Sequence, residues 1–198
     1  MSTTMPLPTP RRSRSWRPRP EPPKFWAKAR RPPGAKWRKD RASAVREHDS
    51  YEGETIKQAA ANMTAFPLDI IRDSATILNN LTYYEPRVDK DGPNMTWPMY
   101  TGAAARAGNA EKAFYFFAKA TEPYKKGPFA ILALRPYLNT TFFGTSAGGI
   151  LQSVILGFGG LHFTAEGLVQ SNPLLPAGWK EITVKAIGAA QNFEVRPD

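Results

Sequence analysis

Apolar residues recur at spacings of three and four positions between residues 54 and 121, a pattern typical of helices with one buried face. It predicts helices over residues 54–65, 74–84, 94–107 and 110–120. Asp73 and Asn109 directly precede two of these segments and are suitable N-caps, because a short polar side chain can accept hydrogen bonds from the first turn. The succession predicts paired antiparallel helices that form part of an all-helical barrel.

A different pattern follows residue 145. Ser146 precedes a strongly apolar segment, residues 150–156, which we predict to be a helix capped by this serine. Beyond a glycine-rich stop, apolar and polar residues alternate, which predicts β-strands over residues 161–164, 167–170, 181–187 and 192–196. The expected fold is therefore mainly α: a partial helical barrel, followed by a few antiparallel β-strands.

Charge divides the chain near residue 50. The first 50 residues carry 14 lysines and arginines against four acidic residues, and the rest carries 13 residues of each sign. The basic segment is rich in proline and poor in apolar residues, so burial cannot offset the entropy of ordering it. We therefore predict a disordered segment over residues 1–50, a helical part over residues 51–160 and a β-strand subdomain over residues 161–198.

The basic arm could bind nucleic acid or an acidic lipid surface through its positive charge. It lacks the interleaved aromatic residues of a surface on which bases stack. A solvated tail is the simpler interpretation, so nucleic acid is not the expected partner.

Composition excludes several kinds of chemistry. The chain has no cysteine, which rules out disulfides, thiol nucleophiles and Cys-ligated metals. His48 and His162, the two histidines, do not stand at metal-ligand spacing, so neither a metal nor a cofactor is expected. No apolar run reaches the roughly 18 residues of a membrane helix, so no membrane partner is expected. The first ten residues lack the apolar core of a secretory signal, and the localisation is left open.

Five short segments carry a resemblance to a known family. They are, in order, Glu54-Thr55-Ile56-Lys57-Gln58-Ala59, Asp91-Gly92-Pro93-Asn94-Met95-Thr96, Gly127-Pro128-Phe129 followed by Phe143-Gly144-Thr145-Ser146-Ala147-Gly148-Gly149-Ile150-Leu151-Gln152, Gly157-Phe158-Gly159-Gly160-Leu161, and Leu175-Pro176-Ala177-Gly178-Trp179-Lys180. Any one of them is weak, but the ordered set, which covers nearly all of residues 51–198, resembles glycoside hydrolase family 65.

The resemblance implies a fold and a reaction. The fold would be the last helices of an (α/α)6 barrel and the start of a C-terminal β-sandwich. Members of the family act on α-glucosides such as trehalose and kojibiose with inversion, as hydrolases or phosphorylases, and several are secreted. Phosphorylases usually carry a histidine where this chain has Phe143, which favours the hydrolase branch.

The same resemblance assigns roles to few residues. Lys57 and Gln58 would bind the glucosyl unit, because an ammonium and a planar amide offer several directed donors to sugar hydroxyls. The general acid of the family lies upstream of the portion that is matched here. Its general base would fall on Leu134, which cannot deprotonate water, and the family's aspartate after the Lys-Gln pair is Ala60. The chain is therefore expected to lack the full catalytic machinery, and no catalytic residue is assigned.

Three hypotheses remain open. The chain is a fragment or degenerate member of an inverting α-glucosidase family, a non-catalytic carbohydrate- or partner-binding module, or a nucleic-acid-associated protein that uses its basic arm. A partial barrel leaves apolar helix faces uncovered, which predicts self-association or pairing with a missing half-barrel.

Other candidates have simpler structural explanations. Residues 145–149 could cradle an anion at a helix N-terminus, but a cap with close packing is favoured. Glu122 could be a displaced carboxylate, Trp97 a platform for sugars and the aromatics at 114–117 a sugar-binding surface; surface charge and core packing are favoured for these. Four Asn-x-Thr sequons could carry glycans in an exported chain: Asn62, Asn80, Asn94 and Asn139.

Overall fold

The computed structural model describes residues 44–58, 60–139, 142–165, 167–187 and 191–197. Every described residue lies in residues 37–198, the second of the two units into which the chain divides. The predicted disordered segment lies outside the described residues as far as residue 43. Within residues 44–50, which are described, Ala44 and Val45 are buried and Glu47 bonds to the start of α2, whereas residues 48–50 are exposed.

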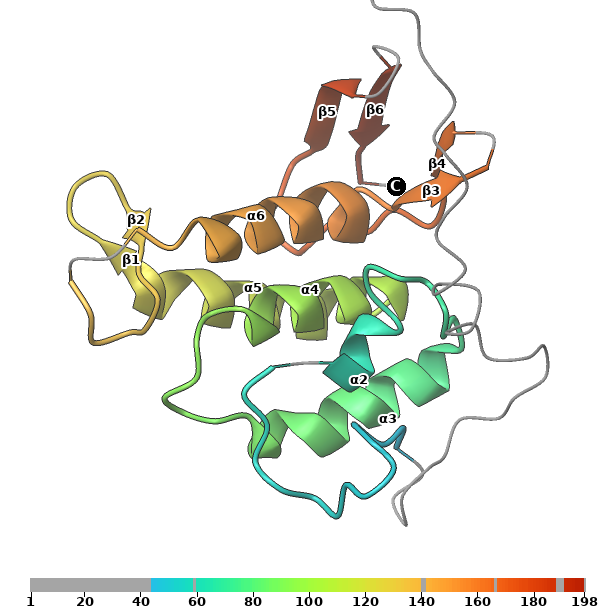
Figure 1. The fold of residues 1–198 in the computed structure, drawn as a ribbon. Helices are drawn as coiled ribbons and strands as arrows, with labels where there is room; N and C mark the ends of the chain where they lie inside the picture. Colours follow the sequence, from blue (N-terminus) through green and yellow to red (C-terminus); the bar gives the residue numbers. More distant parts are fainter. Residues whose placement is uncertain (1–43, 59, 140–141, 166, 188–190, 198) are drawn as a thin grey trace, which may run out of the picture. The chain divides into compact units, whose positions relative to one another are not determined.

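The helical elements follow one another along the chain, and a β-hairpin lies between α5 and α6 (Figure 1). They are α2 (Ala60–Met63), α3 (Ser74–Tyr84), α4 (Thr96–Arg106), α5 (Ala110–Thr121), α6 (Gly144–Gln152), which continues as a π-helical segment (Ser153–Phe158), and two short 3-10 turns (Glu85–Arg87 and Glu122–Tyr124). Asp73 accepts a hydrogen bond from the backbone N–H of Thr76 at 2.8 Å, and Asn109 accepts one from Lys112 at 2.8 Å. Both predicted caps are confirmed.

The strands form three separate antiparallel pairs in the described part of the chain. They pair as β1 (Lys125–Lys126) with β2 (Ile131–Leu132), β3 (Leu161–Thr164) with β4 (Gly167–Gln170), and β5 (Ile182–Ile187) with β6 (Gln191–Val195). The four strands predicted after residue 160 are thus confirmed within one or two residues. The described elements close no barrel.

The predicted helix over residues 54–65 is wrong, since only Ala60–Met63 is helical. Ile56 instead pairs with the chain near Val88: its N–H donates to Arg87 O at 2.8 Å, and its carbonyl accepts from Asp89 N at 2.7 Å. These bonds use backbone groups that a helix would need, and the pairing partner lies far along the sequence. An extended segment therefore replaces the first part of the helix.

The predicted Ser146 cap is also wrong. The helix begins two residues earlier, at Gly144, and its N-terminal flanking residue Phe143 makes no side-chain cap. Ser146 lies within α6 and is fully buried. Its hydroxyl oxygen lies 2.6 Å from Asn94 Nδ2, which also donates to Ala120 O at 2.7 Å. The serine therefore joins α6 to the residues around α4 and α5.

Helix α4 is the centre of the helical layer, with α6 on one side and α2 and α3 on the other (Figure 1). Its Gly102 admits close neighbours, because a Cβ there would lie 2.3 Å from the ring of the buried Phe66. A Cβ on Gly157 would lie 3.2 Å from the Cα of Gly102. Because these two glycines have no side chain, the backbone of α4 can lie close both to Phe66 and to the π-helical segment that contains Gly157.

An aromatic cluster joins α5 to the segment before β5. The rings of Phe117, Phe158 and Trp179 have centroids 5.5–5.8 Å apart. Among the predicted packing aromatics, Phe116 is fully buried, whereas Phe114 and Tyr115 are 39% and 50% exposed. The prediction of core packing therefore holds for Phe116 and Phe117 but not for Phe114 and Tyr115.

Candidate functional site

Lys57 and Gln58, the two residues predicted to bind a sugar, are both exposed and line one open pocket of about 480 Å³. The pocket lies where the extended segment meets residues 44–54. The Lys57 carbonyl accepts a hydrogen bond from Thr96 Oγ1, at the start of α4, at a distance of 3.3 Å. The Lys57 ammonium and the Gln58 amide have no hydrogen-bond partner among the described residues, so both are available to a ligand.

The rest of the pocket comes from residues for which the sequence suggested no role: Glu47, His48, Tyr51 and Glu54. Glu47 lies in the segment that was predicted to be disordered. Its two carboxylate oxygens accept from Ala60 N at 3.1 Å and Ala61 N at 2.8 Å. The only sequence signal was that the region of family resemblance begins at residue 51, shortly after Glu47.

The segment that carries Glu47 is held by buried contacts. Val45 is 2% exposed, and its N–H donates to Asn80 Oδ1 at 2.9 Å. The hydroxyl of Tyr84, on the next turn of α3, donates to Val45 O at 2.6 Å. The floor of the pocket therefore depends on residues upstream of residue 51.

The two carboxylates of the pocket differ in environment. Burial raises the pKa of Glu47, although the N–H groups of Ala61 and Ala60 oppose that shift. Backbone N–H groups, including those of Glu52 and Gly53, lower the pKa of Glu54. Both oxygens of Glu47 are already engaged with backbone donors, so this carboxylate supports the loop more than it offers a proton. The described residues of the pocket offer an ammonium, an amide and two carboxylates, and these two carboxylates do not form an evident acid–base pair.

A tyrosine closes the pocket on its inner side. The Tyr51 hydroxyl donates to Glu54 O at 2.6 Å, and its ring packs against Tyr84 with centroids 5.7 Å apart. Burial raises the pKa of Tyr51 to about 12. The hydroxyl is therefore neutral at ordinary pH and acts as a donor that fixes the backbone beside Glu54.

Leu134, at the position expected for the general base, is half-buried in the turn after β2. Its carbonyl accepts from Asn94 N at 3.1 Å, and its side chain brings no titratable group. The nearby candidate Glu122 is exposed and pairs with Lys125 at 2.8 Å. Neither residue joins the Lys57–Gln58 pocket.

Trp97 is engaged within the fold. Its ring stacks on Phe116 with centroids 6.1 Å apart, and Lys119 Nζ lies 3.9 Å from the ring centroid. Residues 145–149 form the first turns of α6, where Ser146 is buried and its hydroxyl is bonded to Asn94, while Thr145 and Gly148 are exposed. Packing is the role that the structure gives to Trp97 and Ser146.

Three of the four sequons are incompatible with a glycan on the folded chain. Asn62, Asn80 and Asn94 are at most 1% exposed. Asn139 is exposed in the loop before α6. A glycan can therefore be accommodated only at Asn139 among the four.

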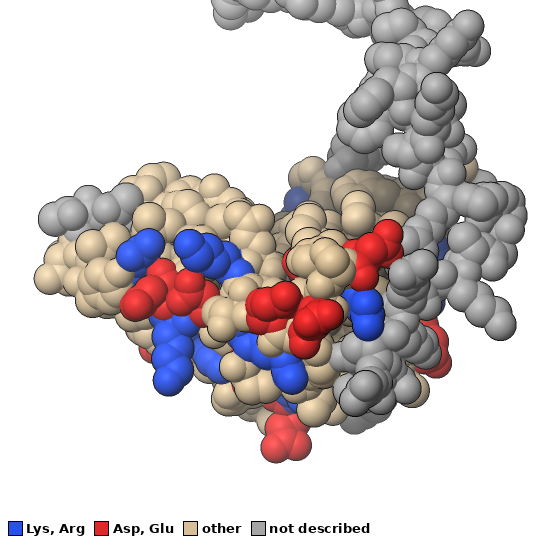
Figure 2. Space-filling view, turned by 60° about the horizontal axis from the view of Figure 1, so that its bottom comes forward, with Lys and Arg blue, Asp and Glu red and all other residues tan. Residues whose placement is uncertain are grey.

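Charges of both signs are mixed on the face drawn in Figure 2. This face presents no single-sign patch of the kind that binds a polyanion. The described residues contain no group of three or more potential metal ligands. None of the helices described is both long and apolar enough to span a bilayer.

Comparisons with known proteins show which class of protein the chain is similar to. No model of a protein family matches the chain. Kojibiose hydrolase from Mucilaginibacter mallensis is 42% identical over 145 residues, 73% of this chain and 21% of the relative. Protein-glucosylgalactosylhydroxylysine glucosidase from Dictyostelium discoideum is 30% identical over 141 residues, 71% of this chain and 20% of the relative.

A third relative extends the group to another activity. The periplasmic/secreted acid trehalase of Candida glabrata is 34% identical over 127 residues, 56% of this chain and 10% of the relative. These similarities confirm the predicted resemblance to glycoside hydrolase family 65 and are consistent with its C-terminal portion. The chain spans about a fifth of the length of the first two relatives.

Proposed function

We propose that the chain is a fragment or degenerate form of a family 65 α-glucosidase that binds an α-glucoside without cleaving it. In this proposal its helices correspond to the last helices of an (α/α)6 barrel, and its strands to the start of a β-sandwich. The observation that carries the proposal is the pocket in which Lys57 and Gln58 lie exposed and unpaired. An ammonium and an amide that are free to turn outward suit a ligand with many hydroxyls.

The absence of cleavage follows from the carboxyl groups. An inverting glycosidase needs one carboxylic acid to protonate the leaving oxygen and one carboxylate to activate water. Leu134 supplies neither, and Glu47 is engaged with two backbone donors. Glu54 alone in the pocket has an oxygen without a described partner, and one carboxylate cannot fill both roles.

The test measures binding and cleavage on the same preparation. We expect kojibiose or trehalose to bind weakly by saturation-transfer NMR, and no glucose to be released. Lys57→Met and Gln58→Ala should each abolish or strongly weaken the signal, whereas Lys180→Met, an exposed lysine outside the pocket, should not. Glucose release that Glu54→Gln abolishes would contradict the non-catalytic proposal, and binding unaffected by Lys57→Met would contradict the assigned site.

A second function, partner binding, is favoured by a group of exposed apolar side chains. Phe129, Phe142 and Leu151 are 85%, 70% and 61% exposed, on the β1–β2 hairpin, the loop before α6 and α6 itself. Exposed apolar area of this kind favours association, and the first two relatives are about five times as long as the segment that matches this chain. In this proposal the surface is covered by the polypeptide that completes the barrel or by a second copy.

Sizing chromatography with light scattering tests this second function. We expect concentration-dependent oligomers, and Phe129→Ser combined with Leu151→Ser should shift the chain towards monomer. A folded wild-type chain that stays monomeric at every concentration would exclude self-association. Recovery of activity on adding the missing half-barrel would favour completion of the barrel.

A further inference from the structure

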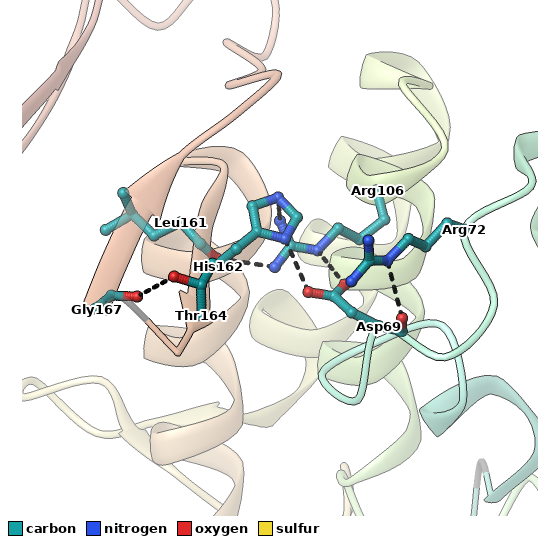
Figure 3. A network of polar contacts seen from close by, with 7 residues as sticks. All are labelled: Asp69, Arg72, Arg106, Leu161, His162, Thr164 and Gly167. Atoms are coloured by element: carbon teal, nitrogen blue, oxygen red, sulfur yellow. Dashed lines mark hydrogen bonds and ion pairs between the residues drawn. The ribbon is translucent and has the colours of Figure 1, made fainter.

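A polar cluster outside the Lys57–Gln58 pocket joins three separate parts of the chain (Figure 3). Asp69 lies in the loop after α2, Arg106 ends α4 and His162 lies in β3. The Asp69 carboxylate lies 3.0 Å from Arg106 Nε and 2.8 Å from His162 Nδ1. The three side chains are only 9–25% exposed, so the cluster is largely shielded from solvent.

The contacts decide where the proton of His162 lies. Arg106 Nη1 is 2.7 Å from His162 Nε2, and a guanidinium only donates hydrogen bonds. Nε2 is therefore the acceptor, and the ring proton lies on Nδ1, where it is donated to Asp69. This Asp–His pair cannot act as a base for a nucleophile, because a cation already occupies Nε2.

A cavity of about 580 Å³ lies beside the cluster. Its volume falls within the range of roughly 300–1,000 Å³ that is usual for small-molecule sites. Part of its wall is apolar and open: Leu68, Phe163 and Val169 are 56%, 76% and 45% exposed. A ligand with an apolar body would remove these surfaces from water.

The remaining wall is positively charged. Among the described residues that line the cavity, Asp69 is the one acidic residue, and Arg106 and His162 already engage its carboxylate. Arg72 Nε donates to Asp69 O at 3.1 Å, but the two terminal nitrogens of Arg72 have no hydrogen-bond partner among the described residues. Burial lowers the pKa of Arg106, while the charge of Asp69 opposes that shift. Among the described lining residues, two arginines and one aspartate leave one positive charge, and Arg72 is the exposed arginine of the two.

We propose that this cavity binds a small organic carboxylate with an apolar body, such as an arylalkyl carboxylate. Its carboxylate would pair with the terminal nitrogens of Arg72, a fork geometry that suits bidentate binding. Its apolar body would lie against Phe163 and Leu68. This site is separate from the Lys57–Gln58 pocket and does not depend on sugar binding.

The experiment titrates phenylbutyrate into the full 198-residue chain and follows binding by calorimetry and amide chemical shifts. We expect saturable binding that Arg72→Gln weakens by at least about fivefold, through loss of the charge-assisted pair. Phe163→Ala, at an exposed position, should weaken binding as well. Arg196→Gln, an exposed arginine outside the cavity, is the matched control and should bind normally.

Phenylbutanol, which has the same apolar body without the charge, separates the two parts of the proposal. We expect it to bind more weakly than phenylbutyrate to the wild-type chain, and equally well to wild type and Arg72→Gln. Circular dichroism checks that each variant is folded. The proposal is overturned if the folded chain shows no saturable binding, if Arg72→Gln binds phenylbutyrate as tightly as wild type, or if the alcohol binds as well as the acid.

Discussion

At the scale of single residues, the strongest constraints come from buried polar side chains. Asn94 is fully buried and ties two helices together through Ala120 O and Ser146 Oγ. Asn139, the exposed sequon residue, makes no hydrogen bond among the described residues that would hold the fold. Two asparagines with the same sequence signature therefore differ entirely in structural role.

This contrast gives a matched pair of substitutions. Asn94→Ala removes a donor to two buried acceptors and should lower the free energy of unfolding by roughly 2–3 kcal/mol. Asn139→Ala should change it by less than about 0.5 kcal/mol, as is usual for exposed positions. Urea unfolding followed by tryptophan fluorescence measures both, and equal effects of the two substitutions would contradict the assigned roles.

Tyr51 predicts a dependence of stability on alkaline pH. Its folded-state pKa is raised from 10.0 to about 12, so the folded chain holds the hydroxyl proton more tightly than the unfolded chain does. The contribution is therefore complete below pH 10 and is lost as the pH rises towards 12. Unfolding free energy measured across this window should fall, and Tyr51→Phe should make the fall shallower; Tyr137→Phe, at an exposed tyrosine, should leave it unchanged.

At the scale of elements, the sequence pattern predicted a helix or strand correctly wherever residues within that element determine its structure. Helices α3 and α5 and strands β3 to β6 were predicted within one or two residues, because a cap or a strict alternation marks each of them. Residues 54–58 were not, because their extended form depends on bonds to Arg87 and Asp89, about 30 residues further on. Part of the site was missed for a similar reason. Lys57 and Gln58 were found through family motifs, whereas Glu47 was recognised only from its bonds to Ala60 and Ala61 in the structure.

Replacing glycines in the helices with alanine tests how closely the helices pack. Gly102 in α4 faces the ring of Phe66, and Gly148 in α6 has no atom within 4 Å of an added Cβ. Gly102→Ala should therefore destabilise the fold by roughly 1–3 kcal/mol through overpacking. Gly148→Ala should stabilise it by about 0.5–1 kcal/mol, since alanine loses less backbone entropy in a helix. Melting temperatures of the two variants should move in opposite directions, and a fall in both would show that the α6 surface is covered.

At the scale of the whole molecule, the question is where the folded unit begins. The change in charge and composition placed the boundary near residue 50, but residues 44–47 bring buried contacts and the floor of the pocket. Val45 exchanges hydrogen bonds with Asn80 and Tyr84. Such contacts cannot be read from composition, because a short apolar pair within a basic stretch has no periodicity.

Two deletions therefore separate the basic arm from the fold. Removal of residues 1–43, which carry 13 lysines and arginines and two acidic residues, should leave cooperative unfolding and any sugar binding intact, while it removes all of the excess positive charge. Removal of residues 1–50 should also expose the surface that Val45 covers and leave Asn80 Oδ1 and the N–H groups of Ala60 and Ala61 without their partners. Loss of the partner of the buried Asn80 Oδ1 alone costs about 1–3 kcal/mol, and the surface that Val45 covers is exposed as well. The shorter chain should therefore melt well below the longer one and lose the pocket. The same two deletions test nucleic-acid binding. Binding to DNA or RNA that depends steeply on salt and is lost when residues 1–43 are removed would be assigned to the basic arm. Equal stability of the two truncated chains would instead show that the folded unit begins near residue 50.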